Sequence, residues 1–93
     1  MNALLADLAA FRDARCWQPF HTPRNLAEAL SVETGELLEC FLWDGQFGHA
    51  KHEPASELAD VLIYALNLCL VLGVDPEHII RQKMAQNAER FPV

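Results

Sequence analysis

Apolar residues recur three or four positions apart along most of this chain, which is the spacing of amphipathic helices. Between residues 22 and 43, for example, one helical face gathers Leu26, Leu30, Leu37, Cys40 and Phe41. No segment combines a sustained apolar–polar alternation with turn residues, as strands would require. The pattern therefore predicts an all-α protein.

Four helices are expected from this spacing and from the residues that begin and end helices. Residues 22–23 (Thr-Pro) and 75–76 (Asp-Pro) each place an N-cap before a proline at the first helical position. Asp-Gly at 44–45 and Gly73 are helix-ending signals. The expected helices are, in chain order, 3–15, 23–43, 55–72 and 76–89. No linker separates them, so residues 1–93 are expected to form a single domain.

Two of these helices carry acidic pairs where apolar residues would be expected. Glu33 falls in the middle of the apolar face of the second helix, and Glu36 lies on its flank. Glu57 and Asp60 lie on the third helix, on the face that also carries Tyr64. Each pair is three residues apart, so its two side chains are neighbours.

Burying ionised carboxylates without compensation costs on the order of several kcal/mol each. Few basic residues stand at matching positions, whereas Mg²⁺ or Mn²⁺ accepts oxygen ligands together with water and substrate phosphates. The candidate ligands of such a cation are Glu33, Glu36, Glu57 and Asp60. In the alternative interpretation, the four acids line an exposed edge. A di-iron centre is disfavoured, because it uses Glu-x-x-His motifs that these pairs lack.

Composition restricts the partners of the chain. The 93 residues carry a net charge of −6, which disfavours binding to the phosphate backbone of nucleic acids. The most apolar run, 61–74, is too short to span a bilayer and is interrupted by Asn67. The first 15 residues lack a signal-peptide pattern, and the three cysteines form no metal-binding or disulfide pattern. We therefore expect a cytoplasmic protein without nucleic-acid or membrane partners.

Hydrophobic residues make up 52% of the chain, which is high for a domain of this length. Several leucines lie on the sides of the second and third helices away from the acids: Leu38, Leu42, Leu62, Leu66 and Leu70. This apolar surface favours burial against other copies of the chain, so a homo-oligomer is expected.

Two acidic motifs carry a resemblance to a known family. ETGE at 33–36 and ELAD at 57–60 fit the ExxE…ExxD signature of the MazG-like all-α nucleotide pyrophosphohydrolases. Longer segments resemble the dCTP pyrophosphatase branch of that family: CWQPFHTPRNLAEALSVETGELLECFLW, ELADVLIYALNL and KMAQNAERFP. The resemblance implies a four-helix-bundle fold assembled as an intertwined homodimer or tetramer. The short loop between the acidic helices departs from longer relatives and leaves the base preference open.

The resemblance also implies an activity. It is the Mg²⁺-dependent hydrolysis of a nucleoside triphosphate, dCTP or a modified dCTP, to the monophosphate and pyrophosphate, in a house-cleaning role. The four acids would bind Mg²⁺, with Mn²⁺ as a possible substitute. One glutamate, such as Glu36, could instead orient or deprotonate the attacking water.

Substrate-binding roles follow from the same resemblance for His21, Asn25, Trp43, Tyr64, Lys83 and Asn87. Arg90 is added by its spacing, although it could simply interact with the helix dipole. Lys83, Asn87 and Arg90 are four and three residues apart and form one stripe suited to a triphosphate. Aromatic rings suit stacking on a base, and His or Asn can bind its edge. Trp17 and Phe20 could also contribute. Ordinary packing for the aromatic residues, and ordinary surface polarity on the last helix, are the alternative interpretations.

Two other functions stay open. One is a phosphoribosyl-ATP pyrophosphohydrolase-like enzyme, which the FHTPRNL and DVLIY segments disfavour. The other is a non-catalytic helical oligomer that binds nucleotide or metal. A catalytically dead relative would most simply have lost an acid, and all four are present.

Overall fold

The computed structural model describes residues 1–42 and 53–93. Its elements are α1 (Asn2–Ala14), the short 3₁₀ helix η1 (Gln18–Phe20), α2 (Pro23–Leu42), α3 (Pro54–Leu72) and α4 (Pro76–Arg90). The described residues contain no strand, so the all-α prediction is confirmed. The helix bounds agree with the expected ones to within one residue, except that the expected end of the second helix, Trp43, lies outside the described residues.

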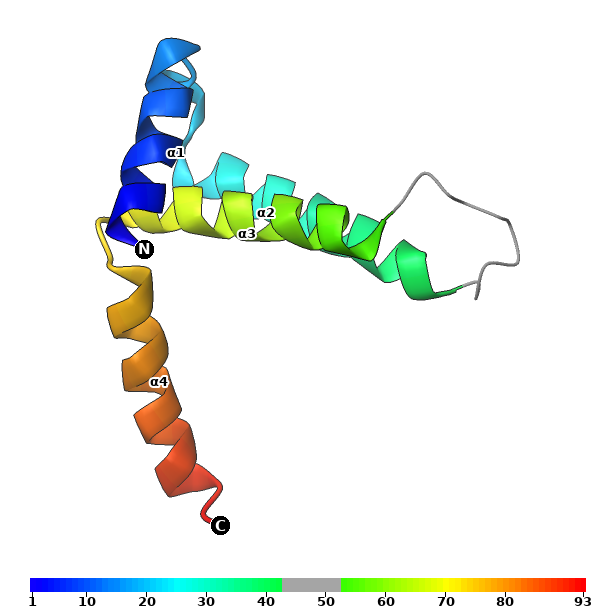
Figure 1. Ribbon diagram of the computed structural model, residues 1–93, viewed down its shortest axis with the longest axis vertical. Helices are drawn as coiled ribbons and strands as arrows, with labels where there is room; N and C mark the ends of the chain where they lie inside the picture. The colour runs from blue at the N-terminus through cyan, green and yellow to red at the C-terminus, as the bar shows by residue number, and fades with distance from the viewer. Residues whose placement is uncertain (43–52) are drawn as a thin grey trace.

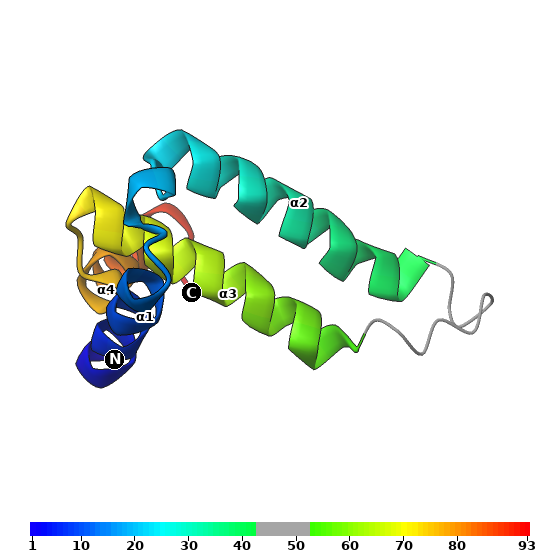
Figure 2. The same cartoon turned by 90° about the horizontal axis from the view of Figure 1, so that it is seen from above.

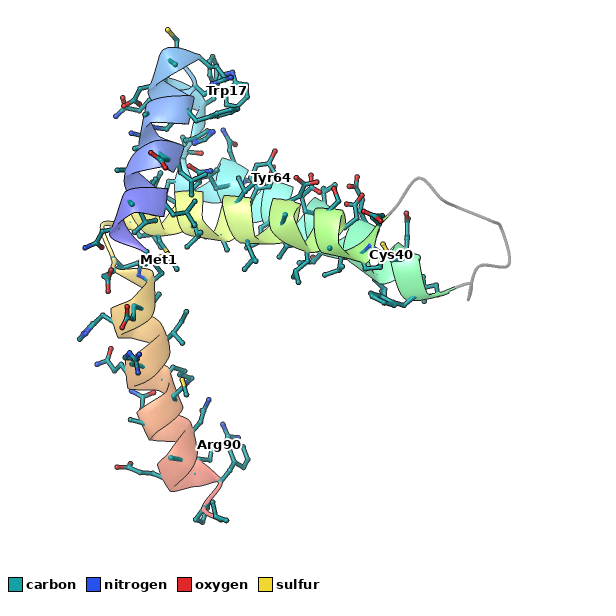
Figure 3. The ribbon with its side chains drawn as sticks, in the orientation of Figure 1. Met1, Trp17, Cys40, Tyr64 and Arg90 are labelled. Carbon is teal, nitrogen blue, oxygen red and sulfur yellow. The ribbon has the colours of Figure 1, made fainter. Side chains whose placement is uncertain are left out.

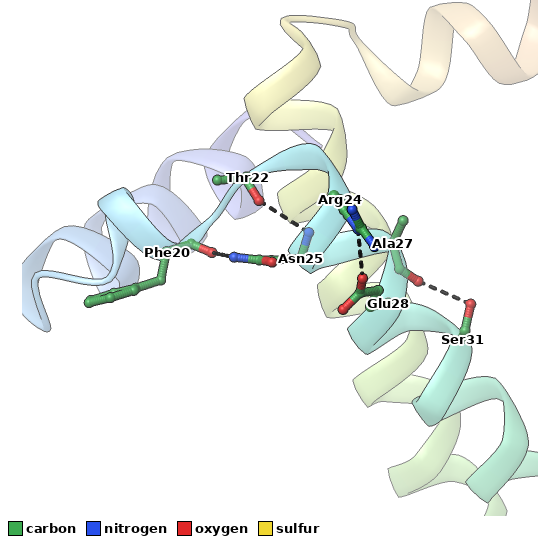
Figure 4. Close-up of polar contacts among 7 residues, drawn as sticks. All are labelled: Phe20, Thr22, Arg24, Asn25, Ala27, Glu28 and Ser31. Carbon is green, nitrogen blue, oxygen red and sulfur yellow. Dashed lines mark hydrogen bonds and ion pairs between the residues drawn. The ribbon is translucent and has the colours of Figure 1, made fainter.

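Capping groups explain where the helices begin and end. The Thr22 hydroxyl oxygen accepts a hydrogen bond from the Asn25 backbone N–H (3.1 Å) at the start of α2 (Figure 4). At the start of α4, the Asp75 carboxylate accepts one from the His78 N–H (2.9 Å). Gly73 ends α3 at φ 68°, a left-handed conformation that a side chain would strain.

The helices α2 and α3 form an antiparallel hairpin and lie side by side over their length (Figures 1 and 2). The helix α1 crosses the C-terminal part of α3 and contacts it, while η1 leads the chain from α1 to the start of α2. Beyond Gly73 the chain turns, and α4 extends away from the hairpin. Helices α1, α2 and α3 and the short helix η1 therefore lie together, while α4 stands apart from them.

This arrangement leaves little enclosed core in one chain. Among the described residues, the fully buried apolar side chains are Leu26, which is 2% exposed, and Pro76 at the start of α4. The radius of gyration is 15.9 Å, against about 12 Å for a compact domain of this length. Among the leucines expected to face outward, Leu38, Leu42 and Leu62 are exposed, and Leu66 and Leu70 are half-buried. The four helices thus do not close into a compact bundle within a single chain.

The helix α3 is long and apolar enough to cross a membrane by length and composition alone, with a mean hydropathy of 1.7. A helix from the core of a soluble protein has the same properties, so this is weak evidence for a membrane span. Glu57 and Asp60 lie in its first two turns and would be costly in a bilayer.

Candidate metal and nucleotide site

Three carboxylates meet between α2 and α3. One oxygen each from Glu33, Glu36 and Glu57 lies within 4.8 Å of the others. Glu57 is buried, at 8% exposure, and the other two are half-buried. The spacing of three residues on α2 turns Glu33 and Glu36 to the same side, and the antiparallel hairpin brings Glu57 opposite them. The oxygen-only donor set and its spacing suit a hard divalent cation.

The electrostatics of Glu33 show the cost of this arrangement. Burial raises the pKa of Glu33 above its usual value, and the neighbouring Glu36 raises it further through its charge and a hydrogen bond. The charges of Asp60 and Glu57 add to the rise in this pKa. In addition, Glu33 Oε2 is buried and has no hydrogen-bond partner. Among the described residues no arginine or lysine pairs with Glu33 or Glu36, so a bound cation is the counter-charge that fits.

Asp60 connects this acidic group to a pocket. It lies outside the three-oxygen group, yet it is close enough to raise the pKa of Glu33, and it lines a neighbouring cavity of about 520 Å³. Helices α1, α2 and α3 and the η1 segment all contribute walls. The lining residues are Leu8, Phe11, Arg12, Trp17, Phe20, His21, Asn25, Leu26, Ala29, Asp60, Ile63, Tyr64 and Asn67. Asp60 thus lies both close to the acidic group and in the wall of the aromatic pocket.

An aromatic series forms the outer wall of the pocket. The rings of Phe11 and Trp17 meet edge to face, with centroids 5.9 Å apart, and Trp17 lies 6.3 Å from His21. The Arg15 guanidinium stacks 3.3 Å from the centre of the Phe11 ring. These contacts restrain the Phe11 and Trp17 rings.

His21 lies between η1 and α2, and Asn25 lies in the first turn of α2. The Asn25 side-chain N–H donates to the Phe20 carbonyl (3.0 Å), which ties η1 to the first turn of α2 (Figure 4). His21 Nδ1 is buried without a hydrogen-bond partner. Burial, and then the charge of Arg12, lower the pKa of His21, so its imidazole is held neutral near pH 7.

The structure gathers some of the residues expected to bind substrate and separates others. His21, Asn25 and Tyr64 line the pocket beside Asp60, as do Trp17 and Phe20.

The remaining expected residues lie elsewhere. Lys83, Asn87 and Arg90 are exposed on α4, and Figure 3 shows Arg90 at the end of α4 that points away from the hairpin. The Arg90 guanidinium lies 5.1 Å from the centre of the Phe91 ring. Trp43 lies outside the described residues. One chain therefore does not bring the α4 stripe to its own acids.

Two polar pocket residues were not expected from the sequence, Arg12 and Asn67. In the sequence Arg12 resembles an ordinary charged residue near the end of the first helix, and in the structure it pairs with Asp13 (2.9 Å). In the sequence Asn67 only interrupts the apolar run 61–74. The sequence does place Asn67 near the acids, because it lies seven residues after Asp60 and therefore on the same face of the helix.

These features define an all-α protein with opposed acidic pairs on two antiparallel helices, and the chain belongs to the MazG-like family, whose family model matches residues 29–93. It is 42% identical to dCTP pyrophosphatase 1 of Rattus norvegicus over 101 residues, covering all of this chain and 58% of that protein. The identity to dCTP pyrophosphatase 1 of Homo sapiens is 42% over 100 residues, 99% of this chain and 57% of that protein. The chain thus spans little more than half the length of these relatives.

Two further relatives are covered over most of their length. A dATP/dGTP diphosphohydrolase of Cyanophage S-2L is 36% identical over 94 residues, 97% of this chain and 79% of that protein. A crystal structure of a pyrophosphatase from Archaeoglobus fulgidus superimposes with a TM-score of 0.88 at 43% identity, covering 100% of this chain and 93% of that one.

Proposed function

We propose that this protein is a nucleoside triphosphate pyrophosphohydrolase that converts dCTP or a modified dCTP into the monophosphate and pyrophosphate. One observation carries the proposal: Asp60 belongs both to the acidic surroundings of Glu33 and to the wall of the aromatic pocket. A nucleotide with its base in the pocket would therefore present its phosphates to the acids. The names of the relatives support this reaction class.

The proposed metal ligands are Glu33, Glu36, Glu57 and Asp60, with Mg²⁺ as the ion and Mn²⁺ as a substitute. The buried, unpartnered Oε2 of Glu33 and the oxygen-only donor set support this choice. When bound, the ion would neutralise the triphosphate and lower the pKa of the attacking water. Glu36 could instead orient that water, since it is less enclosed than Glu57.

The pocket residues would hold the nucleoside. Trp17 and Tyr64 offer ring faces to the base or sugar, and His21 and Asn25 offer polar edges. Because the imidazole of His21 is neutral, it adds no positive charge and can bind an uncharged group. The polar pocket residues would thus select the base while the acids hold the triphosphate.

The chain is proposed to act as an intertwined homodimer or tetramer. The exposed apolar side chains on α2, α3 and α4, such as Phe41, Leu62 and Met84, support burial against a second copy. In such an assembly Lys83, Asn87 and Arg90 of one copy could reach the triphosphate at the acids of the other. The protein is further proposed to be cytoplasmic, to have a house-cleaning role and to have no membrane partner. The net charge of −6 supports the absence of a nucleic-acid partner.

The test is a panel of nucleoside triphosphates with Mg²⁺, in which pyrophosphate and orthophosphate are measured separately. We expect pyrophosphate from dCTP, and no orthophosphate. The panel includes dATP and dGTP, because the phage relative is named for those substrates. Orthophosphate released singly from dCTP would contradict the proposed reaction.

Variants of the acids connect the reaction to the site. Glu33→Gln and Asp60→Asn should keep their helix content by circular dichroism while kcat/KM falls at least about 100-fold, since a metal supplies several kcal/mol of transition-state stabilisation. Glu28→Gln is the matched control, because Glu28 is exposed and pairs with Arg24 on the same helix (Figure 4). Full activity in both acid variants would remove the metal assignment.

A further inference from the structure

Asn67 is a buried amide in the middle of the most apolar helix. Its side chain is 6% exposed, and its Nδ2 donates to the Ile63 carbonyl one turn earlier (3.0 Å). Its Oδ1 is buried and has no hydrogen-bond partner. An unpartnered buried amide oxygen lowers stability, and a leucine at this position would avoid that cost. Folding alone therefore gives no reason for an asparagine here.

The position of Asn67 relates it to the pocket. Asp60, Tyr64 and Asn67 follow one another at spacings of four and three residues, so they share one face of α3, and all three line the cavity. At a rise of about 1.5 Å per residue, Asn67 lies about 10 Å along the helix from Asp60. The acids therefore mark one end of this stripe and Asn67 marks the other.

The unpartnered atom of Asn67 is an oxygen, so any group that binds it must be a hydrogen-bond donor. The Ile63 carbonyl can only accept, so the amide turns its N–H₂ toward that carbonyl, and the atom left over is the oxygen. An amide oxygen accepts hydrogen bonds and cannot donate them. Its complement in the pocket is an N–H or O–H donor, and the exocyclic amino groups of cytosine and adenine are such donors.

We propose that Asn67 selects the base: its Oδ1 accepts a hydrogen bond from an exocyclic amino group when the phosphates lie at the acids. Uracil and thymine carry a carbonyl oxygen at the same place, which would oppose Oδ1. The inference rests on the proposed function, because it assumes that the pocket holds a nucleobase. It assigns the preference for an amino-bearing base to one residue of α3.

The test compares dCTP with dUTP, which differ at C4 by an amino group and a carbonyl oxygen. Wild-type protein should show a kcat/KM for dCTP at least roughly tenfold above that for dUTP, as expected of a site built to bind a substrate N–H. In Asn67→Leu we expect the dCTP value to fall roughly tenfold while the dUTP value does not fall, because leucine removes both the acceptor for the amino group and the oxygen that opposes the uracil carbonyl. A preference that Asn67→Leu leaves unchanged would overturn the inference.

Folding is checked in the same variant. Asn67→Leu should melt at or above the wild-type temperature, because it removes an unpartnered polar atom. A merely structural role for Asn67 would instead lower the melting temperature and leave the dCTP preference intact. Ser31→Ala is the control, since the Ser31 hydroxyl donates to the Ala27 carbonyl one turn back (3.1 Å), like Asn67, but outside the pocket. It should change neither the preference nor the kinetics.

A binding measurement separates this inference from the proposed reaction. Calorimetric titration with dCTP and dUTP in Ca²⁺ reports base preference without turnover. Tighter binding of dCTP that disappears in Asn67→Leu supports the role of Asn67 even if no pyrophosphate forms. Hydrolysis of dCTP with a base preference that is the same in both proteins leaves the reaction standing and overturns the role of Asn67. Absence of binding and of turnover overturns both.

Discussion

Glu33 is half-buried on α2, with carboxylates beside it on the same helix and opposite it on α3. Its raised pKa means that the folded chain binds the Glu33 proton more tightly than the unfolded chain does. The stabilisation that comes with this proton is present at low pH and is lost as the pH rises from the usual 4.5 through the raised pKa. The carboxylate thus destabilises the metal-free fold at neutral pH.

Glu33→Gln should therefore stabilise the metal-free protein at neutral pH. We expect the melting temperature of the variant, measured in EDTA, to exceed that of wild type at pH 7.5, and the difference to shrink as the pH falls toward 4.5. The measurement is a series of thermal melts of both proteins across this range. A difference that does not vary with pH would show that the ionisation of Glu33 carries no folding cost.

A divalent cation should reverse this cost. Mg²⁺ at a hundredfold excess over its dissociation constant stabilises the protein that binds it by about 2.7 kcal/mol. The resulting rise in melting temperature should be larger at pH 7.5 than at pH 5, because protons compete for the same oxygens. Asp60→Asn should reduce the rise, and Glu28→Gln should leave it unchanged. An equal rise in all three proteins would place the ion elsewhere.

The acids could be predicted from the sequence because charge at an apolar register conflicts with burial. Glu33 and Glu57 occupy positions where the helical repeat predicts apolar residues, and this mismatch is visible in the sequence alone. The positions of Arg12 and Asn67 in the pocket could not be predicted in the same way, since each residue has an ordinary local explanation. Arg12 and Asn67 line one pocket only because α1 crosses α3, and the spacing of apolar residues does not predict how two helices cross.

At the scale of the elements, Gly73 determines where α3 ends. The Gly73 N–H donates to the Leu70 carbonyl (3.3 Å) and the Val74 N–H donates to the Cys69 carbonyl (3.0 Å), which completes the last turn. The backbone at φ 68° permits these bonds and directs the chain into α4. This glycine therefore matters for its conformation, since a Cβ would meet no atom within 4 Å.

Gly73→Ala should destabilise the fold by about 1 kcal/mol, because an L side chain is strained at positive φ. Urea denaturation measures the free energy of unfolding. Gly35→Ala is the matched control: Gly35 is inside α2 with open space around its Cα, so alanine there should stabilise by about 0.5–1 kcal/mol. Destabilisation by both substitutions would show that helix α2 needs the glycine for another reason.

The helix bounds could be predicted well, since caps and prolines act locally. Residues 22–23 and 75–76 gave the starts of α2 and α4, and Gly73 gave the end of α3. The direction of α4 after Gly73 could not be predicted. An amphipathic helix needs a partner surface, but its sequence does not state whether that surface belongs to the same chain.

At the scale of the whole molecule, the separation of the α4 stripe from the acids can be tested by mixing two inactive variants. If Lys83 serves the acids of a second copy, a mixed dimer of Asp60→Asn and Lys83→Ala chains contains one intact site. Random exchange makes half of the dimers mixed, so about a quarter of wild-type activity should return.

The measurement is pyrophosphate release before and after subunit exchange, with sedimentation to establish the oligomer. Each variant mixed with itself is the control and should stay inactive. Mixtures without recovered activity would show that Lys83 serves the acids of its own chain. Activity in the Lys83→Ala control would instead show that Lys83 has no role at the triphosphate.

Few apolar side chains are fully buried among the described residues, only Leu26 and Pro76, and this has a consequence for how the chain folds in a cell. If the missing contacts come from a second copy, then acquiring the native state is a second-order event. Dilution itself should act as a denaturant, and the midpoint of unfolding should rise with protein concentration. The amount of chain that a cell makes would then set what fraction of it survives proteolysis as well as how much enzyme is present.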